Sequence, residues 1–165
     1  MTGDSCPDAD PLVLMPRFRV SVEKHGAATY PEECCGVLVG RRLQERPGHL
    51  VLKLRPVDNE RQDSRGNRFL IHPETVLAAE KEARQQDLEV LGYYHSHPDH
   101  PAEPSDFDRE HAWPGLSYVI VSVREGEADE VRSWRLADDR SRFIVEPLLH
   151  AVPPPPGAAV TKEEA

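Results

Sequence analysis

The sequence predicts an α+β fold built as a single domain. Its 165 residues suit one hydrophobic core, because domains commonly hold about 100 to 150 residues. Apolar residues also follow two different spacings along the chain: some segments have the spacing of a helix, and others have that of a buried or half-buried strand. Helices and strands are therefore mixed. We expect a mostly antiparallel sheet flanked by helices.

The expected elements follow from their flanking residues. A helix over 20–30 ends at Pro31, because proline cannot continue it, and a strand over 34–39 ends at Gly40. Pro73 suits the first position of a helix over 73–86. Ser105 is a typical N-cap for a short helix that ends before Pro114. Further strands are expected over 50–54, 69–71, 88–97, 116–123, 131–136 and 143–145, with a turn over 125–130.

Both ends of the chain are expected to be disordered. The first segment, 1–14, opens with the acidic stretch MTGDSCPDAD, which also lacks the basic and apolar regions of a secretory signal. The last segment, 151–165, contains the run Pro153 to Pro156 and then GAAVTKEEA, a composition that favours extended, solvated backbone. The folded domain is therefore expected over 15–150.

Composition excludes several classes of protein. No apolar run approaches the ~18 residues needed to cross a bilayer, so a membrane protein is not expected. The net charge is -9 and lysine and arginine do not cluster, which argues against nucleic acid as a partner. Three cysteines cannot all pair, and Cys34 and Cys35 are neighbours. This usage is typical of a reducing compartment, so we expect a cytoplasmic protein.

The densest chemical signal is His95-Ser96-His97, followed by Ser105 and Asp108. Two histidines separated by one residue on a strand project from the same face, roughly 6.6 Å apart along the backbone, so both can bind one ion. Zinc accepts histidine nitrogen and carboxylate oxygen, and catalytic zinc sites use three protein ligands. The set His95, His97 and Asp108 meets that requirement.

Each part of this pattern has a simpler explanation. Histidines are common in proline-rich surface loops, and Ser105 to Asp108 also matches the S-x-x-[DE] pattern that caps a helix without any metal. The capping and metal interpretations are compatible, because a cap would hold Asp108 on the first helical turn, facing the strand that carries the histidines. The conjunction of both motifs favours the metal site.

Other reactive residues fit less well. The spacing of four nearby side chains does not place them on the face shared by the two histidines: Asp99, His100, Asp106 and His111. We interpret Asp99 and His100 as loop residues that could contact a substrate, and His72 as the entrance to a helix. A thiol nucleophile has no spacing signature here, so Cys34 and Cys35 are expected in the core.

These motifs resemble those of the JAMM, or MPN-plus, zinc metalloproteases. The family signature is a glutamate, then H-[ST]-H, seven residues, serine, two residues and aspartate, and HSHPDHPAEPSDFD matches it without a gap. The upstream stretch YPEECCGVLVG is similar to the family's E-x-x-G, with Glu33 three residues before Gly36 and Glu32 one residue out of register. The resemblance covers roughly 17–146 and is closest to the compact bacterial branch.

The resemblance implies an MPN-type domain with a curved sheet and a zinc site at a strand end. It makes His95, His97 and Asp108 the ligands of one Zn²⁺ per chain, Glu33 the general base, and Ser105 a donor to the oxyanion. The reaction would be hydrolysis of a peptide or isopeptide bond. The compact branch includes peptidases of ubiquitin-like sulfur-carrier proteins, whose Gly-Gly tails would be the substrate. An inactive MPN-type scaffold and a zinc hydrolase of a small amide are the alternatives.

Overall fold

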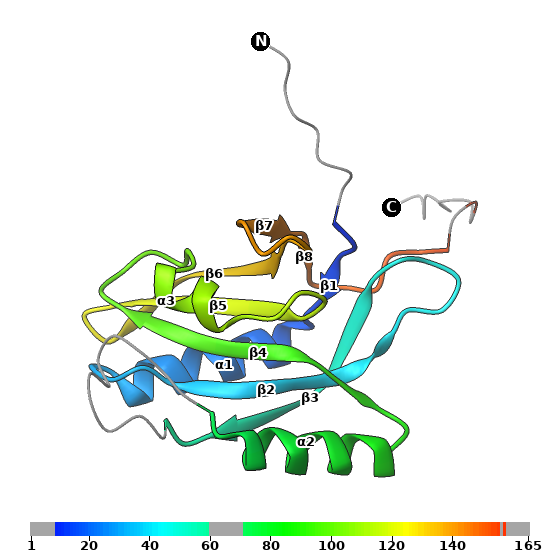
Figure 1. Ribbon diagram of the computed structural model, residues 1–165. Coiled ribbons are helices and arrows are strands. Elements are labelled where there is room, and N and C mark those ends of the chain that lie inside the picture. Colours follow the sequence, from blue (N-terminus) through cyan, green and yellow to red (C-terminus); the bar gives the residue numbers. More distant parts are fainter. Residues whose placement is uncertain (1–8, 60–70, 156, 158–165) are drawn as a thin grey trace.

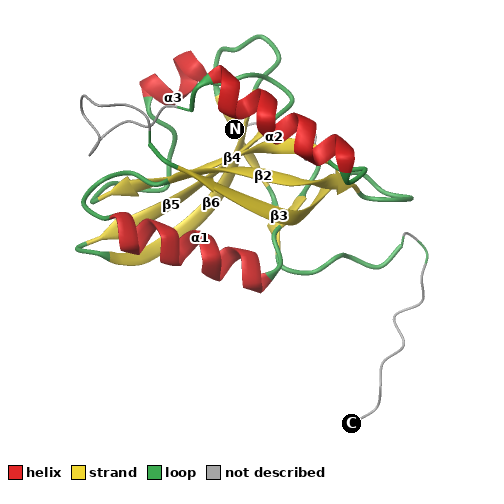
Figure 2. Cartoon of the chain, turned by 90° about the horizontal axis from the view of Figure 1, so that it is seen from below, coloured by secondary structure: helices red, strands yellow, loops and turns green. Residues whose placement is uncertain are grey.

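The computed structural model describes residues 9–59, 71–155 and 157, which form an eight-stranded sheet between helices. Figures 1 and 2 show α1 on one face of the sheet and α2 and α3 on the other. The strands are β1 (Leu12–Val13), β2 (Cys35–Arg42), β3 (His49–Val57), β4 (Glu89–Pro98), β5 (Ser117–Arg124), β6 (Glu127–Leu136), β7 (Phe143–Glu146) and β8 (Leu148–Leu149), and the helices are α1 (Pro16–Thr29), α2 (Pro73–Gln85) and α3 (Asp106–His111).

The order of the strands determines where α3 can lie. The sheet runs β7-β6-β5-β4-β2-β3-β1-β8, and the pairs β2/β3, β2/β4, β5/β6 and β6/β7 are antiparallel. The central pair β4/β5 is parallel, so the chain must cross back over the sheet between these strands. Because α3 belongs to that crossover, it stays close to the end of β4. The predicted α+β class with a mostly antiparallel sheet is confirmed.

Apolar side chains fill both faces of the sheet. The larger cluster lies between α1 and the sheet and includes Val22, Leu38 and Val121. A second cluster under α2 joins Val37 to Ala79. In the described part of the chain, no helix combines the length and the apolar character that crossing a bilayer requires.

Helix α1 begins earlier than the expected residue 20. It starts at Pro16, where the fixed φ of proline suits the first helical position and no N–H is lost from the hydrogen-bonded ladder. Its contact with the sheet is close at Gly26, where an added Cβ would lie 3.0 Å from Val123 Cγ2 and 3.2 Å from Val121 Cγ1. Glycine therefore lets α1 pack directly on β5.

The expected disorder of segment 1–14 is wrong for Leu12, Val13 and Leu14. All three side chains are fully buried, and β1 pairs in parallel with both β3 and β8. A two-residue strand carries no periodicity of its own, and its partners lie far away in the sequence, so only the tertiary fold reveals it. The folded domain thus begins before residue 15. Residues 1–8 lie outside the described residues.

Other boundaries also differ from the expectation. The turn is limited to Glu125 and Gly126, whose φ values of 50° and 86° suit a two-residue hairpin, and β6 therefore begins at Glu127 instead of residue 131. The start of β6 is acidic and exposed, which made it resemble a turn. For the expected strand 69–71, residues 69 and 70 lie outside the described residues and Ile71 is not in a strand. Strand β8 was not expected, and the predicted disorder of 151–165 stays a prediction.

We expect Leu14→Ala to lower the free energy of unfolding by ~2 to 5 kcal/mol, because it would leave a cavity among fully buried side chains. Urea denaturation followed by circular dichroism measures this change. The control is Leu77→Ala, since the Leu77 side chain is 64% exposed and its truncation should change stability by less than ~0.5 kcal/mol. Equal stability of the two variants would contradict the core position of Leu14.

Candidate metal centre

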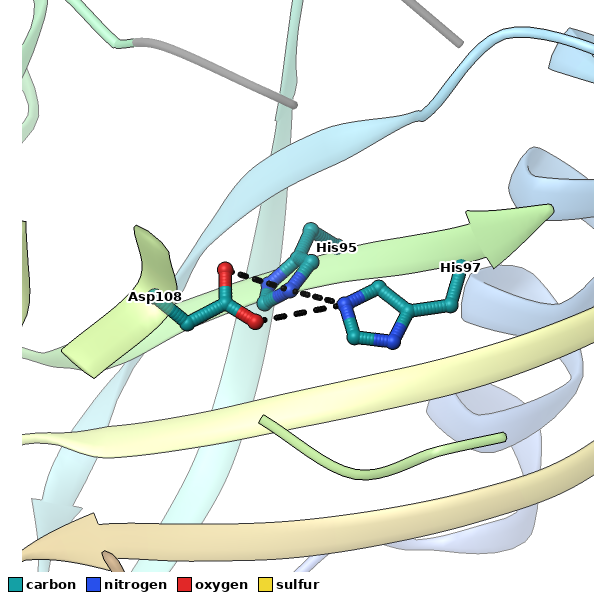
Figure 3. Close-up of side chains that lie close together, drawn as sticks. All are labelled: His95, His97 and Asp108. Carbon is teal, nitrogen blue, oxygen red and sulfur yellow. Dashed lines mark hydrogen bonds and ion pairs between the residues drawn. The ribbon is translucent and has the colours of Figure 1, made fainter. Parts of the chain in front are cut away.

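Two histidines of β4 point to the same face of the sheet. Side chains alternate along a strand, so His95 and His97 project together while Ser96 projects toward Gly26 of α1. The Nε2 atoms of the two imidazoles lie 3.1 Å apart. Figure 3 shows both rings turned toward the carboxylate of Asp108. The structure therefore brings together the three side chains that the sequence motif singled out.

The carboxylate comes from the first turn of α3. Asp108 Oδ1 lies 3.3 Å from His95 Nε2, and Asp108 Oδ2 lies 3.3 Å from His97 Nε2. A capping box fixes the start of the helix: the Asp108 N–H donates to Ser105 Oγ (3.1 Å), and the Ser105 N–H donates to Asp108 Oδ2 (2.8 Å). The helix cap and the histidine cluster thus use the same carboxylate.

These three side chains are suited to hold a metal ion. One donor atom from each lies within 4.8 Å of the others, and all three residues are buried. Two imidazole nitrogens with one carboxylate oxygen are a donor set that zinc accepts, and three protein ligands leave a coordination position open. The chemistry of the donors therefore fits a catalytic metal site.

The protonation of these groups also favours a cation. Burial alone would raise the pKa of Asp108, but His95 and His97 beside it hold that pKa well below its usual range, so the carboxylate is ionised. Burial lowers the pKa of His95. For His97 burial acts in the same direction, but the hydrogen bond and charge of Asp108 outweigh it and raise the pKa. The cluster therefore combines an ionised carboxylate with a neutral His95 ring, and only His97 must lose its extra proton to bind a metal.

A backbone carbonyl orients His97. Its Nδ1 lies 2.9 Å from the carbonyl oxygen of Pro101. A carbonyl can only accept, so Nδ1 carries the proton and the lone pair of Nε2 in the neutral ring faces Asp108. Such a partner on the outer nitrogen is common for metal-binding histidines.

Glu33 is buried beside this cluster. Its exposed fraction is 3%, whereas Glu32 is exposed, and Oε2 of Glu33 has no hydrogen-bond partner among the described residues. Burial raises the pKa of Glu33 to about 8, while the charge of His97 lowers it and that of Asp108 raises it. A bound cation would lower this pKa. Glu33 is thus a carboxyl group that can exchange a proton near neutral pH.

Ser96 was part of the motif, but its role was not predicted from the sequence. The Cys34 N–H donates to Ser96 Oγ (2.8 Å), and the Ser96 N–H donates to the Cys34 carbonyl (3.1 Å). This pair joins the residue before β2 to the middle of the histidine motif. It consequently places Glu33, the neighbour of Cys34, next to His97.

Other sequence candidates lie outside the cluster. Asp99 accepts from the Tyr30 hydroxyl (2.6 Å) and from the Glu125 N–H (2.9 Å), so it connects the segment after β4 to the end of α1 and to the turn between β5 and β6. His100 is exposed, and His72 is the exposed residue that precedes α2, as expected.

The two cysteines before and in β2 are core residues, as predicted. Cys34 and Cys35 are buried free thiols. Burial raises the pKa of Cys34 to about 11 and that of Cys35 to about 12, so neither is a thiolate at neutral pH. Because the thiolate is the reactive form, a cysteine nucleophile is not supported.

Comparisons with known proteins identify the family of this chain. Residues 19–137 match the family described as prokaryotic homologs of the JAB domain. A desampylase from Haloferax volcanii is 36% identical over 126 residues, which cover 72% of this chain and 87% of the relative. A CysO-cysteine peptidase from Mycobacterium tuberculosis is 30% identical over 128 residues, which cover 77% of this chain and 84% of the relative.

A solved structure is also similar to this chain. The solution structure of a Salinibacter ruber protein has a TM-score of 0.67 and 39% sequence identity, and the match covers 88% of this chain and 94% of that one. The family match spans most of the chain and includes every residue of the cluster around His95. The chain therefore belongs to the JAB/MPN family, among the prokaryotic homologues of the JAB domain.

Proposed function

We propose that the protein is a zinc-dependent peptidase or isopeptidase that cleaves the C-terminal tail of a ubiquitin-like sulfur-carrier protein from the group attached to it. The observation that carries this proposal is the buried cluster of His95, His97 and Asp108 beside Glu33, whose Oε2 has no hydrogen-bond partner within 9–59, 71–155 and 157. The named relatives, a desampylase and a peptidase, are hydrolases.

The proposed roles follow from position and charge. His95, His97 and Asp108 would hold the ion; zinc supplies Lewis-acid polarisation of a carbonyl and lowers the pKa of water. Glu33 takes a proton at Oε2 from the water whose oxygen attacks the scissile carbonyl, and it delivers that proton to the leaving amine as the bond to the carbonyl breaks. General acid–base catalysis of this kind typically contributes ~10² to 10⁴ in rate.

Ser105 has a second role in the proposal. Its Oγ accepts from the Asp108 N–H, so the hydroxyl hydrogen stays available for donation. The side chain is exposed at the start of α3 and can reach a substrate. There it donates to the oxygen that becomes negative in the transition state.

The substrate class rests on resemblance. The compact bacterial branch includes peptidases of sulfur-carrier proteins, and the name of the Mycobacterium relative refers to a CysO-cysteine bond. An extended Gly-Gly tail could reach a site at a strand end without side-chain clashes. We also place the protein in the cytoplasm, where Cys34 and Cys35 would remain reduced.

The scaffold alternative is less well supported. A buried carboxyl group without a partner lowers stability by about 1–3 kcal/mol. In a binding module that carries out no proton transfer, nothing would offset this loss. In the part of the chain that the structure describes, Glu33 is such a group, and it lies next to three metal donors. A zinc hydrolase of a small amide would need the same site, and the activity assay separates it from a peptidase.

Purified protein should hold about one zinc per chain, and His97→Ala should lose it, because two remaining ligands do not sustain a tight site. Elemental analysis of both proteins measures the content. His100→Ala is the matched control, since this histidine is exposed in the neighbouring loop and its removal should leave zinc in place. Full zinc content in the His97→Ala protein would remove His97 from the ligand set.

Glu33→Gln should keep both fold and zinc while hydrolysis falls by ~10² or more, because an amide cannot take up the proton. Glu32→Gln should stay active, since Glu32 is exposed. Hydrolysis of a carrier-tail peptide joined to cysteine, followed by chromatography, gives both rates. If Glu32→Gln were the inactive variant, the upstream motif would be misplaced by one residue.

Ser105→Ala should lower kcat by ~10² to 10³ if its hydroxyl stabilises the oxyanion. The same change removes the helix cap and should lower stability by ~1 kcal/mol. Measuring kcat at saturating substrate, with zinc content and Tm determined on the same sample, separates the two effects. A lower Tm with unchanged kcat would leave Ser105 with the capping role alone.

A further inference from the structure

An apolar cavity lies next to the metal cluster. It has a volume of about 180 Å³, and His95 and Asp108 form part of its wall. The rest of the wall is apolar or aromatic except for His111, and it includes residues of α2, α3, β5, β7 and the neighbouring segments, among them Ile71, Val76, Phe107, Trp113, Tyr118 and Phe143. The cavity therefore opens directly beside the atoms that would bind the ion.

The hydroxyl group of Tyr118 already has a hydrogen-bond partner. Its hydroxyl oxygen accepts from the Trp113 N–H (2.8 Å), and its ring meets Phe143 edge-on with centroids 5.8 Å apart. The two rings thus contribute mainly apolar surface to the wall of the cavity. The Trp113 side chain is 65% exposed, and the guanidinium carbon of Arg140 lies 5.2 Å from the centre of its ring.

The cavity and Glu33 lie toward opposite ends of the cluster. Along the cluster face of β4, Tyr93 contributes to the cavity wall, His95 comes next, and His97 follows. Cys35 pairs with His95 across β2 and β4, and Cys34 is hydrogen-bonded to Ser96. Glu33 therefore lies level with His97, and it contributes to a different, polar pocket with His25 and Thr29. A substrate bound across the cluster would therefore have one half near Glu33 and the other half at the cavity.

The role of Glu33 indicates which half of the substrate, the amine or the acyl half, lies at the cavity. Because Glu33 delivers its proton to the leaving amine, that amine must lie on the Glu33 side. The acyl half of the substrate then extends in the other direction, past His95 toward Tyr93 and Tyr118. These two tyrosines are paired across β4 and β5. The cavity consequently faces the chain that ends in the scissile carbonyl.

The size of the cavity limits what can enter it. A cavity of about 150 Å³ lined by apolar side chains accommodates a molecule as large as benzene. The volume of about 180 Å³ thus suits one medium-sized apolar side chain and not a folded segment. Among the described residues no lysine or arginine contributes to its wall, whose ionisable members other than tyrosine are His95, Asp108 and His111, so most of the lining favours an apolar group.

We propose that this cavity is the subsite for one apolar side chain, such as leucine, on the acyl half of the substrate, a few residues before the scissile bond. The inference rests on the proposed peptidase function and assigns the sequence preference of the same site. If the last two residues are glycine, they span ~6.6 Å in extended form, so the third or fourth residue from the bond supplies the side chain.

The test uses peptides of one length. Acetyl-Ala-Ala-Ala-Gly-Gly-Cys is compared with versions that carry leucine at the third or fourth residue before the Gly–Cys bond. We expect one leucine position to raise kcat/KM by at least about 10-fold, because the side chain leaves water for an apolar pocket. Calorimetry with the zinc-loaded Glu33→Gln protein measures binding of the same peptides without turnover, and the same peptide should bind about 10-fold more tightly.

Two variants of neighbouring residues show whether the cavity causes the preference. Val76→Phe places a ring in the cavity and should reduce the leucine advantage to less than about 2-fold in both assays. Leu77→Phe makes a similar enlargement one residue further along α2, on an exposed side chain, and should keep the advantage. Phe143→Ala should enlarge the cavity and shift the preference from leucine to phenylalanine.

The two assays separate this inference from the proposed function. If all peptides are cleaved without a leucine advantage, or if the advantage survives in Val76→Phe, the subsite is wrong and the peptidase stands. If nothing is cleaved but leucine still strengthens binding in a Val76-dependent way, the subsite stands and the proposed reaction is wrong. If leucine changes neither cleavage nor binding and no peptide is cleaved, both are wrong.

Discussion

The two hydrogen bonds between Ser96 and Cys34 determine the geometry of the site. They connect the start of β2 to the end of β4 through a fully buried serine side chain. A shift of one residue in this pairing would turn every side chain of the strand to the other face. Glu33 would then leave the histidine cluster. The middle residue of the histidine motif thus fixes the position of the carboxyl group relative to both imidazoles.

The site also concentrates groups that reduce the stability of the fold. Glu33, His95, His97 and Asp108 are all buried, and a core of apolar side chains of similar volume would avoid their desolvation. The capping box of α3 and the Pro101 carbonyl offset part of this cost by giving Asp108 and His97 partners. A bound cation would offset more, because it attracts both carboxylates. Metal binding and folding are therefore thermodynamically coupled in this protein.

Much of the fold and the cluster could be predicted from the sequence. The ligand candidates lie in one contiguous motif on β4 and α3, so local spacing and the family resemblance were enough to identify them. Strands β1 and β8 could not be predicted, since two residues show no period and pair only with distant segments. The cavity could not be predicted from the sequence either. Val76, Phe107 and Phe143 are scattered apolar residues, and only the packing of α2, α3 and β7 around β5 brings them together.

The glycine of the upstream motif has a structural explanation with an evolutionary consequence. Gly36 pairs with Tyr94 across β2 and β4, and a Cβ at Gly36 would lie 2.2 Å from the tyrosine ring. Tyr94 is itself fully buried, and its hydroxyl is 2.8 Å from Nδ1 of His25 on α1. The ring thus occupies the space that any larger residue at position 36 would need. Related proteins should therefore vary at these two positions together: a side chain in place of the glycine requires a smaller residue in place of the tyrosine.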